Sequence, residues 1–286
     1  MSRTITLPDG RSLGVAELGD PDGFPVVVHH GTPGSGLLYE RWATEGVRLI
    51  GFDRAGYGDS SRNPGRAAAS AAADVDALAD ALGLERFATW GVSGGGPHAL
   101  ACAALCGDRL TAAASLAGPA PWGAEGLDWL AGMGEANVAE FDAALAGEKA
   151  VRPLAERDRA ELLASTPEQL REVVESLLGD ADRAVLTGEL AEYLHAVAVR
   201  GLGGSVDGWV DDDLVFAAPW GFDLAAITRP VLIVQGGGDR FVPRAHGAWL
   251  AAHVPGCEAW LDDAHGHLTL FQQIVPEVHA WLLRHS

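Results

Sequence analysis

One serine of the chain stands in a pattern that can support nucleophilic chemistry. Ser93 is the centre of the run GVSGG at 91–95, which follows the strand-like run FATW and precedes the helix-like run GPHALACAALC. A G-x-S-x-G turn between a strand and a helix lifts the serine hydroxyl clear of the sheet and directs the positive end of the helix at it. Because the chain has 37 glycines, the pattern alone can arise by chance, and the flanking strand and helix give it weight. We therefore expect Ser93 to be a nucleophile.

A serine nucleophile needs a base to accept its proton and an acid to orient that base. After this kind of turn, the acid and then the base come later in the chain. Asp239 follows the apolar run PVLIVQ through three glycines, at the end of an expected strand, where parallel sheets place their sites. Two histidines, His265 and His267, lie in the run DDAHGHLTL after another expected strand. The residues alone leave both histidines open as the base, and they leave Asp239 open as an ordinary loop aspartate.

Acyl transfer also needs two backbone N–H groups that point at the developing oxyanion. The first is expected from Gly94, the residue after the nucleophile. The second is expected from the loop after the strand-like run PVVVHH, where the sequence is HGTPG and Thr32 is the best candidate. By itself, HGTPG is a Gly/Pro turn that closes a strand. It acquires a catalytic meaning only beside the serine turn.

The histidine pattern does not indicate a metal site. His29 and His30 are adjacent on an expected strand, so their side chains point to opposite faces and cannot bind one ion together. The pair formed by His265 and His267 has no H-E-x-x-H motif or carboxylate cluster beside it. We therefore expect neither a metal nor a cofactor.

Charge and composition limit the partners of the chain. The formal net charge is −19, from 39 acidic and 20 basic residues, and such a surface repels the phosphates of nucleic acids. The three cysteines form no disulfide framework and suit a reducing compartment. The N-terminus has no apolar signal region, and no run reaches the roughly 18 apolar residues that a spanning helix needs. We expect a cytoplasmic protein with a small-molecule substrate, no nucleic acid and no membrane partner. A homodimer remains open.

Strand-like and helix-like runs alternate at the start and at the end of the chain. A hairpin is predicted around the turn PDG at 8–10, and buried strands are predicted for PVVVHH, VRLIGFD, FATWG and PVLIVQG. This alternation indicates a mostly parallel sheet with crossover helices. In the last predicted helix, Pro276 should introduce a kink or delay the start. Residues 119–223 carry helix-like runs only, so we expect a helical unit between two parts of one sheet domain, 1–118 and 224–286.

Together, these motifs resemble the α/β-hydrolase superfamily, specifically its cap-bearing group of esterases, epoxide hydrolases, haloalkane dehalogenases and prolyl aminopeptidases. The resemblance covers nearly the whole chain outside the helical unit and rests on the runs HGTPGS, DRAGYGDS, GVSGGG, GGGDRFVP and AHGHLTL. It implies an eight-stranded, mostly parallel sheet with a helical cap after strand 6. In the family pattern, the base is the histidine of a G-H pair, here His267, and the acid is the aspartate of a G-x-x-D segment, here Asp239. The DRAGYGDS loop is usually structural, so Asp53 and Arg54 are expected to be scaffold residues.

The resemblance also narrows the reaction. Dehalogenases and epoxide hydrolases of this group carry aspartate at the nucleophile position, so Ser93 argues against both. Prolyl aminopeptidases resemble HGGPG and GGSWG where this chain has HGTPG and GVSGG. The expected activity is therefore carboxylesterase-like, with an ester-like bond of a small, largely apolar substrate cleaved through an acyl enzyme. A prolyl-type aminopeptidase, a carbon–carbon bond hydrolase and a perhydrolase remain alternatives on the same triad, and so does a ligand receptor that does not catalyse.

In the family, the cap covers the site and controls access to it, so the substrate pocket is expected to depend on the helical unit. Large aromatic side chains there could line an acyl or alcohol pocket, or they could pack the cap onto the sheet. The candidates are Trp122, Trp129, Trp209, Phe216 and Trp220.

Overall fold

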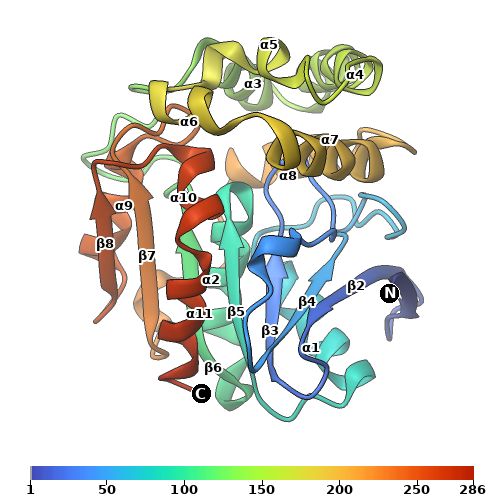
Figure 1. Ribbon diagram of the computed structural model, residues 1–286, viewed down its shortest axis with the longest axis vertical. Coiled ribbons are helices and arrows are strands. Elements are labelled where there is room, and N and C mark those ends of the chain that lie inside the picture. Colours follow the sequence, from blue (N-terminus) through green and yellow to red (C-terminus); the bar gives the residue numbers. More distant parts are fainter. Residues whose placement is uncertain (1) are drawn as a thin grey trace.

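The computed structural model describes residues 2–286, which contain an eight-stranded sheet (Figure 1). The strands are β1 (Ser2–Thr6), β2 (Ser12–Gly19), β3 (Phe24–His29), β4 (Val47–Phe52), β5 (Phe87–Val92), β6 (Leu110–Leu116), β7 (Val231–Gly236) and β8 (Glu258–Asp262). Their spatial order is β1-β2-β4-β3-β5-β6-β7-β8. β2 pairs antiparallel with β1 and β4, and the other pairings are parallel. The predicted hairpin and the mostly parallel eight-stranded sheet are confirmed.

Helices cover both faces of this sheet. They are α1 (Ser70–Leu82), α2 (Gly96–Leu105), α9 (Arg244–His253), α10 (His267–Gln273) and α11 (Val275–Leu283). Alternate residues of β3 point to the two faces, as the pleat requires. Val26 and Val28 pack in one apolar cluster with Trp281 of α11, whereas Val27 packs in a second cluster with Leu78 of α1. β3 is therefore apolar on both sides.

The C-terminal helix is interrupted where the sequence predicted. α10 ends at Gln273, and α11 begins at Val275 with Pro276 in its first turn. A proline is tolerated there because the first N–H groups of a helix have no intrahelical partner. The interruption leaves α10 as a separate short helix that begins with His267. Within residues 2–286, no helix combines the length and the apolar character needed to cross a membrane.

Between β6 and β7 the chain forms α-helices and no strand. These are α3 (Glu135–Leu145), α4 (Glu148–Ala164), α5 (Leu170–Val173), α6 (Asp180–Val185), α7 (Gly188–Leu202) and α8 (Asp207–Phe216), which we call the helical segment. Figure 1 shows the helical segment lying across the end of the sheet toward which β5 and β7 point. Most of its buried apolar side chains join the cluster on the α11 face of the sheet, and Phe141, Val215 and Phe216 join the other cluster. The helical segment therefore packs into both apolar clusters of the sheet.

Glycines allow the helical segment to approach the loops of the sheet closely. A Cβ atom on Gly201 of α7 would overlap the carbonyl oxygen of Gly34. The carbonyl oxygen of Gly201 accepts a hydrogen bond from the N–H of Gly58 at 3.1 Å, and the N–H of Gly208 on α8 donates to the carbonyl oxygen of Gly56 at 3.1 Å. Backbone thus meets backbone where the helical segment crosses the loops.

Replacing Gly201 by alanine is therefore expected to destabilise the protein. Alanine normally favours a helix over glycine, so a loss of stability would come from the overlap with Gly34. We expect the free energy of unfolding to fall by about 1–3 kcal/mol, the usual cost of overpacking. Gly204→Ala is the matched control, because a Cβ there would meet no atom within 4 Å. Thermal unfolding of both variants tests this, and equal melting temperatures would contradict it.

Candidate active site

Ser93 lies at the predicted turn between β5 and α2, where a single turn of 3₁₀ helix joins the two elements. Its φ angle is 54°, in the left-handed region that residues other than glycine rarely adopt. Such strain persists only where the surroundings hold it, and it concentrates at functional sites. The surroundings here are tight. A Cβ on Gly91 would overlap the carbonyl oxygen of Gly95, and a Cβ on Gly95 would overlap the carbonyl oxygen of His29.

Asp239 and His267 form a buried pair. His267 donates its Nδ1–H to Oδ2 of Asp239 at 2.8 Å. The N–H groups of Phe241 and Val242 donate to Oδ1 of Asp239 at 2.9 and 2.8 Å, and the side-chain amide of Gln235 donates to Oδ2 at 3.0 Å. These bonds fix the carboxylate. A carboxylate at Nδ1 selects the tautomer whose Nε2 has a free lone pair.

The pair also sets the protonation of the imidazole. Burial lowers the pKa of His267, but the charge of Asp239 and the hydrogen bond to it more than offset this effect, so the pKa lies above its ordinary value of 6.5. Burial raises the pKa of Asp239, and the charge of His267 opposes that rise. The ring of Phe241 stacks on the imidazole at 4.5 Å between centroids and keeps one face of it from water. The other candidate base, His265, lies beside Asp262 instead.

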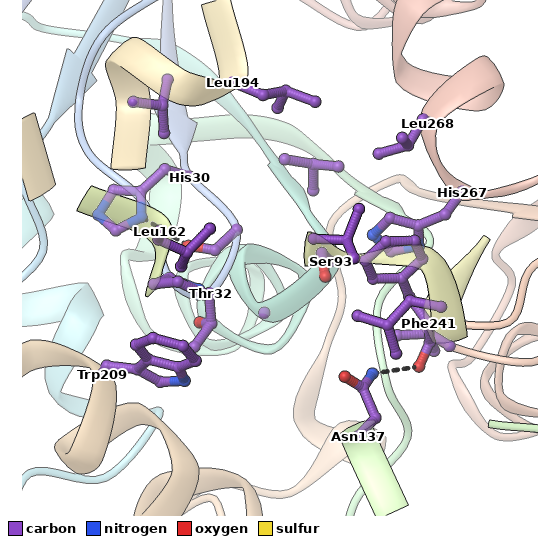
Figure 2. A pocket seen from close by; sticks show the side chains of 18 of the residues that line it. His30, Thr32, Ser93, Asn137, Leu162, Leu194, Trp209, Phe241, His267 and Leu268 are labelled. Carbon is purple, nitrogen blue, oxygen red and sulfur yellow. Dashed lines mark hydrogen bonds between the residues drawn. The ribbon is translucent and has the colours of Figure 1, made fainter. Parts of the chain in front are cut away.

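Ser93 and His267 line one cavity of about 380 Å³ (Figure 2). Its walls come from the loops after β3, β5 and β7, from α10 and from the helical segment. The structure brings several other predicted site residues to this cavity, namely Thr32, Gly94, Trp129, Trp209 and Phe216. Asp239 lies behind His267. The predicted acid, base and nucleophile therefore meet in one place.

Two of the predicted pocket tryptophans lie elsewhere, so the pocket prediction is wrong for them. Trp220 is buried and stacks on Phe222 at 5.8 Å, and Trp122 packs edge-on against Trp129 at 5.2 Å. Neither side chain lines the cavity. Both lie in the connections that join the helical segment to the sheet, and their rings pack against aromatic neighbours there. Position in the chain alone does not decide this, because Trp129 lies in the same connection as Trp122 and lines the cavity.

The sequence matches the profile of the alpha/beta hydrolase fold family over residues 25–273. The chain belongs to this family. Two curated relatives match shorter stretches. A non-heme chloroperoxidase of Streptomyces lividans is 38% identical over 98 residues, which are 32% of this chain and 36% of the relative. A proline iminopeptidase of Xylella fastidiosa is 32% identical over 113 residues, which are 37% of this chain and 36% of the relative. The chain therefore aligns with about a third of the length of each relative.

The fold of this α/β hydrolase family member also occurs in solved structures. A thermophilic esterase from Thermogutta terrifontis superposes with a TM-score of 0.71, covering 100% of both chains at 24% identity. At that identity, the likeness establishes the fold alone. The resemblance drawn from the motifs is thus confirmed at the level of the family.

In this α/β hydrolase, a carboxylate that sequence reasoning missed anchors the helix that begins with His267. Asp182 of α6 is fully buried and accepts hydrogen bonds from the N–H groups of His267, Leu268 and Thr269 at 2.7, 2.8 and 3.0 Å. Negative charge at the start of a helix is favourable. The contact spans 85 positions in the sequence, and no local motif connects the two ends.

A second pair of carboxyl groups lies in the cavity wall. Glu140 of α3 and Asp213 of α8 both line the cavity, and the indole of Trp209 donates a hydrogen bond to Glu140. Burial and the nearby charge of Glu140 raise the pKa of Asp213 well above its ordinary value. Burial also raises the pKa of Glu140. The pair therefore tends to retain one proton, and sequence reasoning gave no sign of it.

The residues expected to be scaffold do hold loops together. Asp53 accepts hydrogen bonds from the N–H groups of Gly36 and Asp59 at 2.7 and 3.0 Å. Arg54 is buried and reaches the loop after β3 and Asp212 of α8. Within the described part of the chain, no group of three or more His, Cys, Asp or Glu side chains is arranged to hold a metal ion.

Substitution of Asp182 should change both the stability of the protein and the pH dependence of its activity. Asp182→Asn should lower the free energy of unfolding by about 1.5–3 kcal/mol, the usual worth of hydrogen bonds to a charged group. It should also move the activity profile to lower pH, because the charge of Asp182 raises the pKa of His267. Asp180→Asn is the control, because that side chain is exposed on the same helix. Thermal unfolding and a pH profile provide the measurements, and identical results for the two variants would refute the role.

Proposed function

We propose that this protein is a serine hydrolase that cleaves an ester-like bond of a small, largely apolar substrate through an acyl enzyme. The observation that carries the proposal is that a strained Ser93 and His267 line one cavity, with His267 hydrogen-bonded to Asp239 behind it. A nucleophile, a base with a free Nε2 and an acid that orients the base are the groups that acyl transfer requires.

In the proposed reaction, Ser93 Oγ attacks the acyl carbon while Nε2 of His267 takes the hydroxyl proton. The carbonyl oxygen becomes an oxyanion, which the N–H groups of Thr32 and Gly94 bind. The carbonyl re-forms, the bond to the alcohol breaks, and His267 gives its proton to the leaving oxygen. A water molecule then attacks the ester of Ser93, with His267 as base again, and the acid leaves as Ser93 regains its proton.

We further propose that residues 119–223 act as a cap that selects the substrate. The support is the composition of the cavity wall, where the helical segment contributes apolar side chains such as Leu162, Leu194 and Val197. Figure 2 shows Leu162 and Leu194 beside the space next to Ser93. A cavity of about 380 Å³ falls within the range of sites for small organic ligands.

An aminopeptidase is the second candidate, because one observation favours it. The carboxyl pair of Glu140 and Asp213 faces the cavity, and a carboxylate there could bind the amino terminus of a peptide. The proline iminopeptidase of Xylella fastidiosa is among the relatives. Hydrolysis of proline p-nitroanilide compared with p-nitrophenyl acetate separates the candidates. An aminopeptidase should prefer the anilide and lose that preference in Glu140→Gln, whereas an esterase should prefer the acetate and retain it.

Ser93→Ala should abolish hydrolysis of p-nitrophenyl acetate, with a fall in turnover of up to about 10⁶ by comparison with other triads. A fluorophosphonate should add one adduct to the wild-type protein and none to Ser93→Ala, as measured by intact mass. Ser35→Ala is the control for labelling, because Ser35 lines the same cavity outside the turn and its loss should leave the adduct in place. Retained hydrolysis or labelling in Ser93→Ala would contradict the proposal. An unlabelled wild-type protein would favour a receptor.

The pH dependence should follow His267. A protonated imidazole cannot accept the proton of Ser93, so kcat/KM should be low in acid and rise as His267 loses its proton. Since the pKa of His267 is raised above 6.5, the half-maximal point should lie above pH 6.5. Asp239→Asn removes the charge that raises this pKa and should move the point downward. It should also lower kcat by as much as about 10⁴, because the tautomer is no longer fixed. A wild-type midpoint below 6.5 would contradict this assignment.

A further inference from the structure

A buried aspartate of the helical segment reaches the loop expected to bind the oxyanion. Asp212 of α8 is fully buried. Its Oδ2 accepts hydrogen bonds from the hydroxyl of Thr32 at 2.6 Å, from Nη2 of Arg54 at 2.5 Å and from the hydroxyl of Tyr57 at 2.9 Å. Its Oδ1 accepts one from Nη2 of Arg66 at 2.6 Å. The carboxylate is therefore held by two guanidinium groups, and it in turn holds the Thr32 side chain.

Arg54 extends this contact to the backbone of the same loop. Its Nη1 donates to the carbonyl oxygen of His30 at 2.6 Å, and its Nη2 donates to the carbonyl oxygen of Gly31 at 3.1 Å and to Oγ1 of Thr32 at 3.1 Å. The carbonyl of Gly31 and the N–H of Thr32 belong to one peptide group. In a trans peptide they point in opposite directions, so anchoring the carbonyl oxygen fixes the direction of the Thr32 N–H.

The imidazole of His30 makes a second contact with that carbonyl oxygen. The N–H of Arg54 donates to Nε2 of His30 at 3.0 Å, so the ring hydrogen must be on Nδ1. Nδ1 then donates to the carbonyl oxygen of Gly31 at 2.7 Å. Burial and the charge of Arg54 keep the pKa of His30 well below its ordinary value, so the ring stays neutral. A carbonyl oxygen with two donors, one of them charged, polarises its peptide and makes the N–H a stronger donor.

We propose that Asp212 is a positioning residue for the oxyanion hole, acting through the Thr32 hydroxyl and through Arg54 on the peptide between Gly31 and Thr32. This inference rests on the proposed function. It assigns the helical segment a part in the rate of acyl transfer in addition to any part in substrate binding. A Cβ on Gly94 would overlap Oγ1 of Thr32, so the two expected donors are neighbours and a small shift of Thr32 changes the space between them.

Thr32→Val tests the contact with little change of shape, because it removes the hydroxyl donor but leaves Asp212 paired with both arginines. The measurements are kcat and KM on p-nitrophenyl acetate and the rate at which a fluorophosphonate phosphonylates Ser93. We expect kcat and the phosphonylation rate to fall about tenfold, a fraction of the roughly 10²- to 10³-fold loss seen when an oxyanion donor is removed. KM should stay close to that of the wild type, and the melting temperature should fall by about as much as in Tyr57→Phe, since both variants remove one hydroxyl donor from the same oxygen of Asp212.

Two variants make this result specific. Thr32→Ser keeps the hydroxyl and should restore both rates to within about twofold of the wild type. Tyr57→Phe removes a hydrogen bond to the same oxygen of Asp212 without touching the loop. It should lower the melting temperature and leave kcat unchanged. A double-mutant cycle of Thr32→Val with Asp212→Asn should be non-additive, with the double variant about as slow as Asp212→Asn alone.

Phosphonylation of the wild type tests the proposed function, and the comparison of Thr32→Val with Thr32→Ser tests the role of Asp212. If Ser93 of the wild type is phosphonylated and Thr32→Val reacts as fast as Thr32→Ser, Asp212 only stabilises the fold and the inference is wrong. Equal losses in Thr32→Val and Thr32→Ser would also overturn it, because the hydroxyl would then not be the cause. If the folded wild type is neither phosphonylated nor active on the ester, the proposed function fails, and the inference fails with it.

Discussion

The parallel hydrogen bonding of the central strands is the constraint on which the site depends. Val28 of β3 pairs with Trp90 of β5, Trp90 pairs with Ala114 of β6, and Leu116 of β6 pairs with Val234 of β7. Parallel strands in register end at the same edge of a sheet, so the loops that follow them emerge side by side. Loops after β3, β5 and β7 are separated by long stretches of sequence, yet the sheet delivers them to one cavity. Backbone pairing thus brings together the loops that carry the predicted site residues.

The sheet supplies only half of what the site needs. Two buried aspartates of the helical segment complete it from the opposite side. Asp182 holds the N-terminus of the helix that begins with His267, and Asp212 holds Arg54 and Thr32. Each contact places a full negative charge against donors that would otherwise be unsatisfied in the interior. The proposed base and the expected oxyanion loop are therefore each tied to the helical segment by one carboxylate.

The sequence allowed the local parts of this arrangement to be predicted. The serine turn, the hairpin and the break at Pro276 depend on residues that are close in the sequence. Glycine, proline and apolar runs therefore predict them directly. The choice of His267 over His265 needed a family pattern. It could not be made from spacing, because both histidines follow the same strand. The structure separates them by placing one against Asp239 and the other beside Asp262.

The parts that could not be predicted depend on packing across long separations. Asp212 lies 180 positions from Thr32, and its run of three aspartates is typical of an exposed helix surface. Glu140 and Asp213 lie on two different helices, and the relative placement of these helices cannot be inferred from the periodicity of apolar residues in the sequence. Trp220 failed as a pocket residue for the same reason, since an aromatic side chain in a helical region gives no sign of whether it faces a ligand or a connection.

The buried pair of Asp212 and Arg54 also bears on how the helical segment can be exchanged. A helical segment without Asp212 would leave Arg54 buried without its carboxylate, at a cost of about 3–5 kcal/mol for a broken buried pair. In a chimera, a foreign helical segment grafted onto this sheet would have to carry its own equivalents of Asp182 and Asp212. Modular replacement of the segment is thus limited to exchanges that preserve both carboxylates.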